Sequence, residues 1–370
     1  MTRPRILIVG AGIAGLSLAQ ALADRGIPAD IVERSAEPRT TGSGLYLPAN
    51  AVRALRLLGL GDALAARARP ITRQRLLDHR GRTLFQFDVG TIWGEVGGCY
   101  AISRTGLQDI LLAAVGADGI RFGTAVDAVD AQGMVTFGDG TRDGYDLVVG
   151  ADGIASAVRA SAFGAASPRF LNQICWRFLA GDPTGTIPDG TWTARLGSKG
   201  RTFLTVPLGD GQVYCYADIN SAQPAPPGTD WRTLFADFAD PVPALLAQGA
   251  NAYFAALEEI DDEDWVRPHA VIIGDAAHAC SPSMAQGGAM ALEDAVVLAE
   301  VLAEVTDRAA VPAALAAYRD RRAARIRWVL AQNHRRDKAR DLPSGLRNLA
   351  LRLVGLRLYQ SNHAELRPQP

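Results

Sequence analysis

Three glycines near the start of the chain have the spacing of a phosphate-binding turn. They are Gly10, Gly12 and Gly15, in the stretch IVGAGIAGL. The first permits a tight turn between a strand and a helix, the second lets the backbone approach a pyrophosphate, and the third lets the helix pack closely on the strand. The N–H groups at the N-terminus of that helix are expected to bind the phosphates, and Ile13 and Ala14 of the turn are further candidate contacts. NAD, NADP and FAD all place a pyrophosphate on such a turn, so the glycines leave the nucleotide open.

A carboxylate follows where a nucleotide-binding unit of this kind needs one. Glu33 ends the next predicted strand, where it can accept hydrogen bonds from both hydroxyls of an adenosine ribose. This disfavours NADP at the same position, because a 2′-phosphate would meet the carboxylate charge. Arg34, the next residue, is a further candidate for nucleotide contact.

The elements that position these residues form a strand, a helix and a second strand. Residues 5–9 are a short apolar run that ends in glycines, as expected of a buried parallel strand. Residues 16–25 have helical apolar spacing and are followed by Gly26, a typical helix C-terminal residue. Residues 29–33 form the second strand. The handedness of such crossovers predicts that the two strands lie side by side in a parallel sheet.

Three later motifs help to decide which of these nucleotides the chain binds. Residues 147–159 (LVVGADGIASAVR) and 272–278 (IIGDAAH) each combine a buried strand with an acidic turn. Residues 282–295 (PSMAQGGAMALEDA) form a loop that opens into a helix. An NAD-dependent dehydrogenase needs neither of the last two motifs, so they favour FAD over NAD.

With these motifs the chain resembles the class A flavin-dependent monooxygenases, which have the para-hydroxybenzoate hydroxylase fold. The resemblance covers most of the chain and is carried by the GxGxxG motif, the DG motif at Asp152 and the GD motif at Asp275. Residues 42–50 (GSGLYLPAN) also look like the family's segment beside the flavin ring. The resemblance implies an α/β fold: a Rossmann-like FAD-binding domain, an interleaved antiparallel β-sheet substrate domain and a helical C-terminal segment.

The resemblance also implies a set of FAD contacts. Asp275 would bind the ribityl chain, Arg104 the phosphate or ribityl region, and the N–H groups of Gly287 and Gly288 the flavin O2, where a helix N-terminus stabilises the anionic reduced flavin. The full implied set is Gly10, Gly12, Ile13, Ala14, Gly15, Glu33, Arg34, Gly44, Arg104, Asp152, Gly274, Asp275, Pro282, Gly287 and Gly288.

Four residues of these motifs carry open questions. Asp152 is either a cofactor and NAD(P)H-related acid or a turn carboxylate that holds Arg159 and the backbone. His278 is interpreted as a packed turn residue rather than a base. The chain has Ala285 and Ala289 where the family usually has Gly and Asn, and Ala285 implies a backbone compatible with a Cβ.

The reaction implied by the resemblance is a monooxygenation. NAD(P)H reduces FAD, O2 adds at the flavin C4a, and the hydroperoxide hydroxylates or epoxidises an aromatic or unsaturated small molecule. Because no second Rossmann motif is present, NADPH or NADH is expected to bind transiently as the electron donor. A flavin-dependent reductase, a redox-neutral cyclase and a binding protein that has lost its chemistry remain alternatives on the same fold.

The pattern of apolar and polar residues predicts that the chain forms two interleaved domains. Short alternating segments with one apolar face occur near 71–87 and 170–219 and predict an antiparallel sheet. The predicted FAD-binding domain consists of residues 1–70, 98–165 and 265–370, and the predicted substrate-binding domain consists of residues 71–97 and 166–264.

No motif names the residues of the substrate pocket. If the polar and aromatic faces of the predicted sheet point at the flavin, Arg201 could pair with a substrate anion, and Tyr214 or Tyr216 could hydrogen-bond to the substrate or stack on it. A solvated sheet face is the alternative. Further candidates are Trp176, Arg177, Arg39 and Tyr46, and the Trp93–Gly94 loop as a hinged lid.

The amino-acid composition of the chain limits the kinds of partner that it is expected to bind. The 38 basic and 39 acidic residues give no general attraction to nucleic acid. No apolar run is long enough to span a bilayer and no signal peptide is recognisable, so a cytoplasmic protein is expected. Four separated cysteines and few histidines predict no metal site. The Leu- and Arg-rich C-terminal helix is expected to dock on the FAD-binding domain, with a membrane or partner surface as the alternative, and the chain to be a monomer or homodimer.

Overall fold

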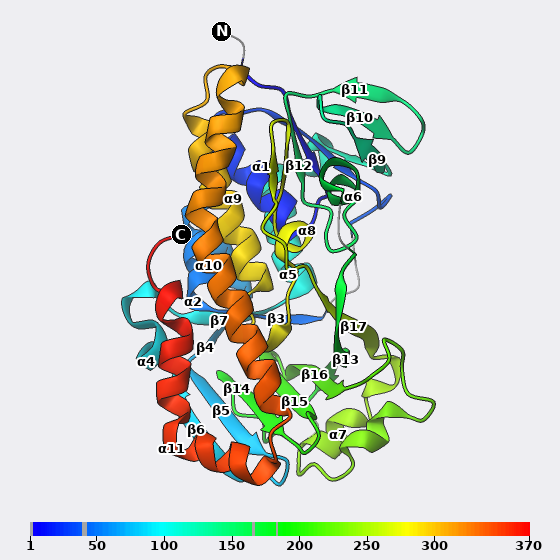
Figure 1. The fold of residues 1–370 in the computed structure, drawn as a ribbon. Coiled ribbons are helices and arrows are strands. Elements are labelled where there is room, and N and C mark those ends of the chain that lie inside the picture. The colour runs from blue at the N-terminus through cyan, green and yellow to red at the C-terminus, as the bar shows by residue number, and fades with distance from the viewer. Residues whose placement is uncertain (1–2, 39–42, 165–166, 183) are drawn as a thin grey trace.

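A six-stranded sheet forms the upper part of the molecule in Figure 1. The computed structural model describes residues 3–38, 43–164, 167–182 and 184–370. Neighbouring strands of this sheet are parallel, except that its edge strand is antiparallel to the next. In spatial order the strands are β18 (Val266–Arg267), β19 (Ala270–Ile272), β12 (Leu147–Gly150), β1 (Ile6–Val9), β2 (Ala29–Glu33) and β8 (Ile120–Phe122).

The central strand β1 is apolar at every position because both faces of the sheet are covered. Ile6 and Ile8 belong to the core under the helices α1 (Ile13–Ala23), α5 (Arg104–Val115) and α9 (Gly287–Ala303). Leu7 and Val9 belong to a second core on the other face. That face is covered by α6 (Ala157–Phe163) and the strands β9 (Val126–Val129), β10 (Met134–Phe137) and β11 (Arg142–Gly144).

A seven-stranded sheet forms the lower part of the molecule (Figure 1). It is antiparallel except where β14 pairs with β5. In spatial order its strands are β17 (Tyr253–Glu259), β13 (Arg169–Gly181), β16 (Gln212–Asn220), β15 (Thr202–Gly209), β14 (Thr191–Leu196), β5 (Arg73–Asp78) and β6 (Thr83–Asp88).

The two faces of this sheet differ in character because side chains alternate along each strand. Trp176 and Phe203 point into an aromatic core with the η3 segment (Trp231–Phe235) and α7 (Val242–Leu246). Their neighbours in sequence point the opposite way. Arg177 pairs with Tyr216, and Tyr216 pairs with Leu204 on β15, so these three side chains share the face turned toward the six-stranded sheet.

A small sheet joins the two parts, with strand order β3 (Gly44–Leu47), β7 (Cys99–Ser103) and β4 (Arg69–Ile71). Gly44 permits this sheet to pack on β16, because a Cβ at Gly44 would lie 2.3 Å from the Cβ of Tyr214. The helices α2 (Ala49–Leu57), α3 (Gly61–Arg67) and α4 (Gly90–Trp93) flank the small sheet.

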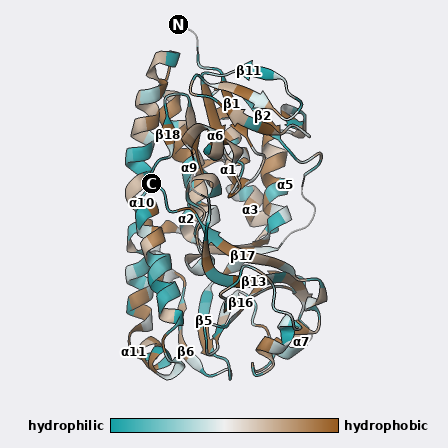
Figure 2. Cartoon of the chain, turned by 45° about the vertical axis from the view of Figure 1, so that its right-hand side comes forward, coloured by the Kyte–Doolittle hydropathy of each residue, from teal (hydrophilic) through white to brown (hydrophobic). Residues whose placement is uncertain are grey.

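The long helix α10 (Val311–Arg340) runs beside both parts, and α11 (Ser344–His363) returns along the lower sheet (Figure 1). Figure 2 shows hydrophobic central strands and many hydrophilic residues on α10. α11 packs on β6 at Gly355, where a Cβ would lie 2.7 Å from the ring of Phe85. No helix in the described ranges is long and apolar enough to cross a membrane.

The predicted fold class is confirmed, and the predicted element boundaries are close. The strand at 29–33 matches β2, and the helix predicted at 16–25 begins earlier, at Ile13. Strand β7 ends at Ser103 and α5 begins at Arg104, because the Ser103 hydroxyl accepts a hydrogen bond from the N–H of Gly106 (3.0 Å). The Trp93–Gly94 segment joins two short helices, α4 and η1 (Gly94–Val96), and Trp93 is buried; a lid role for this segment stays a prediction.

Candidate active site

Two adjoining cavities form one groove between the sheets. The first lies at the carboxyl ends of β1, β2 and β12, and the second lies between the start of α9, the small sheet and the seven-stranded sheet. Both cavities are lined by Gly12, Ile13, Arg104, Ala151 and Gly153. The groove is therefore continuous past the glycine turn.

Each glycine of the turn has a different physical role. Gly10 has a φ of +106°, and a Cβ there would lie 2.5 Å from the carbonyl oxygen of Ala151. A Cβ on Gly15 would lie 1.9 Å from the carbonyl oxygen of Gly10, so this position holds helix and strand together. At Gly12 no protein atom lies within 4 Å of a Cβ position. Gly12 therefore leaves backbone accessible from the groove, as an approaching pyrophosphate requires.

Both acidic and basic residues line the outer end of the groove. Glu33 accepts hydrogen bonds from the N–H groups of Ala11 and Ser35, both at 2.9 Å, and lines the first cavity together with Arg34. Arg104 begins α5, and its backbone N–H donates to the carbonyl of Ser43 (2.7 Å). The two guanidinium groups at this end suit a phosphate-containing ligand.

Asp152 is a partly buried acid that lines the same cavity. Its Oδ2 accepts hydrogen bonds from the N–H groups of Ala157 (2.8 Å) and Val158 (3.3 Å), whereas its buried Oδ1 has no hydrogen-bond partner in the described structure. Burial raises its pKa. Arg159 donates instead to the carbonyl groups of Ala276 and Ile154. The expected contact with the backbone is present, and the expected hydrogen bond to Arg159 is not.

The GD motif turns the chain into the second cavity. Gly274 has a φ of +59° and precedes α8 (Asp275–His278). Asp275 is exposed between buried neighbours and lines the cavity. A Cβ on Gly287 would lie 3.7 Å from Asp275 Oδ1, and none would meet protein within 4 Å at Gly288. The carboxylate and the first turn of α9 thus lie side by side with room at the helix N-terminus.

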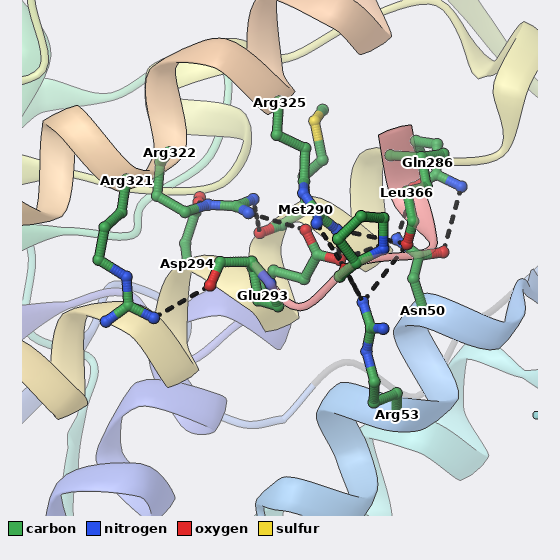
Figure 3. A network of polar contacts seen from close by, with 12 residues as sticks. Asn50, Arg53, Gln286, Met290, Glu293, Asp294, Arg321, Arg322, Arg325 and Leu366 are labelled. Carbon is green, nitrogen blue, oxygen red and sulfur yellow. Dashed lines mark hydrogen bonds and ion pairs between the residues drawn. The ribbon is translucent and has the colours of Figure 1, made fainter. Parts of the chain in front are cut away.

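A buried carboxylate, Asp294 on α9, supports this arrangement; Figure 3 shows it beside Arg322 of α10. It accepts hydrogen bonds from the N–H of Gly274 (2.9 Å) and from Arg322 Nε (2.8 Å), and it contacts His278 Nε2 (2.6 Å). Burial alone would raise its pKa, but its interactions with His278 and Arg322 outweigh burial and lower the pKa to about 2. His278 is therefore a packed residue of the turn, as interpreted from the sequence.

Glu293, the neighbouring residue, ties α9 to the rest of the molecule. Its carboxylate binds Arg322 (2.8 Å) and Arg325 (2.9 Å) on α10. It also accepts from Asn50 of α2 (3.0 Å), which donates to Gln286 at the start of α9 (2.9 Å) (Figure 3). The network fixes the start of α9 from both sides.

The substrate end of the groove combines aromatic rings with an unbalanced positive charge. The Tyr216 hydroxyl donates to Asp218 (3.0 Å), which is ion-paired with Arg340 (2.7 Å). Burial raises the pKa of Tyr214 to about 12, so its hydroxyl is protonated at neutral pH. Arg177 lies 5.8 Å from the centre of the Tyr216 ring and has no carboxylate partner among the described residues.

Arg201 is not part of this site. Its guanidinium forms hydrogen bonds to both Asp237 oxygens (2.7 and 2.8 Å) and lies 5.5 Å from the centre of the Phe238 ring. Leu204, whose side chain points to the opposite face of the sheet, lines the cavity instead. Trp176 is also on the far face, stacked 4.9 Å from Trp231. The expectation for Arg201 was wrong because the sequence does not say which face of a two-sided sheet is turned toward the cofactor.

Several cavity residues were missed from the sequence. They are Gln74, Trp192, Leu204, Arg336, Tyr359 and His363. Tyr46 and Arg177, which were candidates, do line the cavity, and Arg39 lies outside the described residues. Gly15, Gly274, Arg201 and Trp176 line neither cavity, whereas the other predicted cofactor and pocket residues that the structure describes line at least one. Ala285 has a φ of +53°, a left-handed conformation that favours glycine.

His363 brings an imidazole from the end of α11 into the second cavity. Its Nδ1 lies 2.7 Å from the carbonyl oxygen of Tyr359. Because a carbonyl only accepts, Nδ1 is the protonated nitrogen and Nε2 is the acceptor. Burial, with the positive charges of Arg336 and Arg367, lowers the pKa of His363 to about 3. The ring is therefore a neutral hydrogen-bond acceptor at physiological pH.

One group of side chains has the composition of a cation site. Glu259, Asp261 and His334 place ligand atoms close together. However, Glu259 is already ion-paired with Arg169 and contacts His334 Nε2 at 2.9 Å. These contacts account for the buried carboxylate without a metal ion.

Comparison with known proteins places this geometry among flavoproteins. A family model described as an FAD binding domain matches residues 3–221 and 244–333. The chain is 36% identical to the aurachin C monooxygenase/isomerase of Stigmatella aurantiaca over 344 residues, 89% of this chain and 88% of that protein. It is 32% identical to a 2-heptyl-3-hydroxy-4(1H)-quinolone synthase of Pseudomonas aeruginosa over 342 residues, 89% and 87% of the two chains. The crystal structure of Klebsiella pneumoniae HpxO with FAD and uric acid superposes with a TM-score of 0.89 at 29% identity, covering 99% of this chain and 97% of that one.

The first prediction concerns Gly12. Gly12→Val places a side chain in the groove without a clash in the protein, so the unfolding free energy of the apoprotein should change by less than about 1 kcal/mol. FAD affinity should fall by about a hundredfold or more, because the side chain occupies the phosphate approach. Titration of the apoprotein with FAD, followed by flavin fluorescence, measures this. Gly15→Val is the control, since it should destabilise the apoprotein itself; unchanged FAD affinity in Gly12→Val would contradict the assignment.

The second prediction concerns pH. The pKa of His363 is lowered from 6.5 to about 3 in the folded chain, so the unfolded chain binds the extra proton between these values. This stabilising contribution is fully present above pH 6.5 and is lost as the pH falls toward 3, by up to about 1.4 kcal/mol per pH unit. Urea unfolding at several pH values should show a shallower loss for His363→Gln. Parallel slopes for the two proteins would contradict it.

Proposed function

The chain belongs to the FAD-binding-domain family of the class A flavin-dependent monooxygenases, and from this premise we propose that it hydroxylates an electron-rich heteroaromatic ring bearing an ionisable oxygen. One observation carries the choice of substrate class: Arg177 places a guanidinium without a carboxylate partner in an aromatic cavity beside the cofactor groove. Arg177 is partly buried, and removing a cation from water is costly unless an anion balances it. A substrate oxygenate supplies that anion.

The groove residues suit FAD. Glu33 would bind the adenosine ribose, Gly12 and the α1 N-terminus the pyrophosphate, and Asp275 the ribityl chain, with the start of α9 facing the flavin ring. The accessible backbone at Gly12 and Gly288 and the orphan buried Oδ1 of Asp152 support this fit. When bound and reduced by NADPH or NADH, FAD supplies activated oxygen for transfer to the substrate.

The sequence division into domains becomes part of the same proposal. Residues 1–70, 98–165 and 265–370 would form the FAD-binding domain, and residues 71–97 and 166–264 the substrate-binding domain. The second cavity receives side chains from both sets, including Asp275 from the first and Tyr216 from the second. Substrate would therefore be held against the cofactor across the boundary.

Four side chains would orient the substrate. Arg177 binds the ionised oxygen and favours the electron-rich ring that oxygen transfer requires. Tyr214 donates a hydrogen bond, because its hydroxyl is protonated and makes none to a described residue. His363 Nε2 accepts one from a ring N–H or O–H. Trp192 and the other rings of the cavity stack on the substrate and exclude water.

The relatives support a heteroaromatic substrate. Two of them are named for aurachin C and for a 3-hydroxy-4-quinolone, and a related structure holds uric acid. A quinolone and uric acid are nitrogen heterocycles that carry oxygen substituents on the ring, the chemistry that Arg177 and His363 would recognise together. A 2-alkyl-4-quinolone and urate are accordingly the first substrates to test.

The test is oxygen transfer itself. The holoenzyme is given NADPH or NADH with each substrate, and nucleotide oxidation, O2 uptake and 18O incorporation from 18O2 are measured. Substrate-dependent O2 uptake with one labelled oxygen atom in the product is expected. Product formation without O2 uptake would instead indicate a redox-neutral reaction, and nucleotide oxidation with no labelled product would indicate a reductase.

A variant pair isolates the role of Arg177. Arg177→Met should lower kcat/KM by about a hundredfold, because it removes the charge that binds the ionised oxygen of the substrate and keeps it deprotonated, while FAD content stays unchanged. Arg201→Gln is the matched control: it lies on the other face of the same sheet and should retain the activity of the folded wild type. Equal losses in the two variants would contradict the proposed pocket face.

A further inference from the structure

Helix α11 exposes an apolar face that packs against no other part of the chain that the structure describes. In the part of the chain that the structure describes, large exposed hydrophobic side chains occur elsewhere only at Leu57 and Tyr253. On and next to α11 they are Leu342, Leu346, Leu349, Leu353, Val354, Leu356 and Leu358. Leu353 has the largest exposed fraction, 73%, and Leu346 is 64% exposed. The spacing of residues 346, 349, 353 and 356 puts them on one side of the helix.

The charge of this helix has a single sign. α11 contains Arg347, Arg352 and Arg357 and no Asp or Glu, although the whole chain has a net charge of −1. Arg352 and Arg357 are exposed beside the leucines, whereas Arg347 is buried. A helix with exposed leucines bordered by arginines has the composition of helices that lie in the interface of an anionic membrane.

A second copy of the chain fits this face less well. In a two-fold symmetric pair the same patch meets itself. The arginines of one α11 would then face those of the other, and the helix has no carboxylate to balance them. Phospholipid phosphates balance the arginines while the acyl chains cover the leucines. The charge pattern therefore selects lipid over self-association.

The opposite side of the same helix reaches the active site. Tyr359 and His363 line the second cavity, and Gly355 packs against Phe85 of β6. The Tyr359 ring also packs 5.2 Å from that of Phe87 on the same strand. Because these contacts fix the inner side of α11, its apolar side is held outward rather than folded back onto the protein.

We propose that α11 is an interfacial membrane-binding helix, which inserts the side chains of Leu346, Leu349, Leu353 and Leu356 into the surface of an anionic phospholipid bilayer. Arg352 and Arg357 bind the lipid phosphates. The chain then lies on the membrane and does not span it, with the pocket-lining residues of α11 on the side that faces away from the lipid. This binding is independent of the reaction that the site performs.

Vesicle flotation of the FAD-loaded protein tests the proposal. Vesicles of phosphatidylcholine mixed with phosphatidylglycerol should carry the protein, and those of phosphatidylcholine alone should carry much less. Leu346→Ser combined with Leu353→Ser should weaken binding about tenfold or more. Arg352→Gln combined with Arg357→Gln should weaken it toward mixed vesicles and remove its salt dependence. Leu57→Ser, an exposed leucine on α2, is the matched control and should bind as the wild type does.

The contrary outcomes are equally defined. No flotation with anionic vesicles, or flotation that the leucine variant retains, would overturn the proposal. A dimer in sedimentation equilibrium that the leucine variant converts to monomer would assign the face to a second copy instead. Unchanged FAD content and an unchanged unfolding midpoint in the variants show that any loss of flotation comes from the surface and not from misfolding.

Discussion

The buried carboxylate of Asp294 is the constraint on which the active-site groove depends. It is inaccessible to solvent, yet it satisfies the backbone N–H of Gly274, the imidazole of His278 and the guanidinium of Arg322. These partners come from the GD turn and from α10, while Asp294 itself is on α9. Removing one member would leave a buried charge without its counter-charge, which is more costly than never having buried the pair. The GD turn, α9 and α10 are thus coupled.

The groove exists because backbone approaches are closer than side chains would allow. Gly10 and Gly15 bring β1, α1 and the DG turn into contact, and Gly44 brings the small sheet against Tyr214. Gly12 stays clear and leaves backbone open to the ligand. Glycine therefore permits close packing at three of these positions and leaves the backbone open at the fourth. The family fold brings these positions together from segments that are far apart in the sequence.

The sequence predicted best what is decided locally. The glycine turn, Glu33 and the strand leading to Asp275 depend on short-range patterns, and the structure places them on one groove. Whether Arg201 or Arg177 faces the cofactor depends on the burial of a sheet on both faces, which alternation alone does not reveal. Tyr359 and His363 come from the last helix, whose position is set by packing at Gly355 against Phe85, so no local signal marked them. Ala285 adopts a left-handed conformation that its residue type does not suggest.

The most direct test of this account is the FAD affinity of Asp294→Asn, measured together with its unfolding free energy. The side chain does not line the groove, so an effect on FAD must come through the GD turn and α9. We expect the variant to be less stable by about 3–5 kcal/mol and, at a temperature where it is still folded, to bind FAD more weakly. The exposed Asp320→Asn on α10 should change neither quantity. If Asp294→Asn binds FAD as tightly as the wild type, the buried carboxylate does not position the cofactor site.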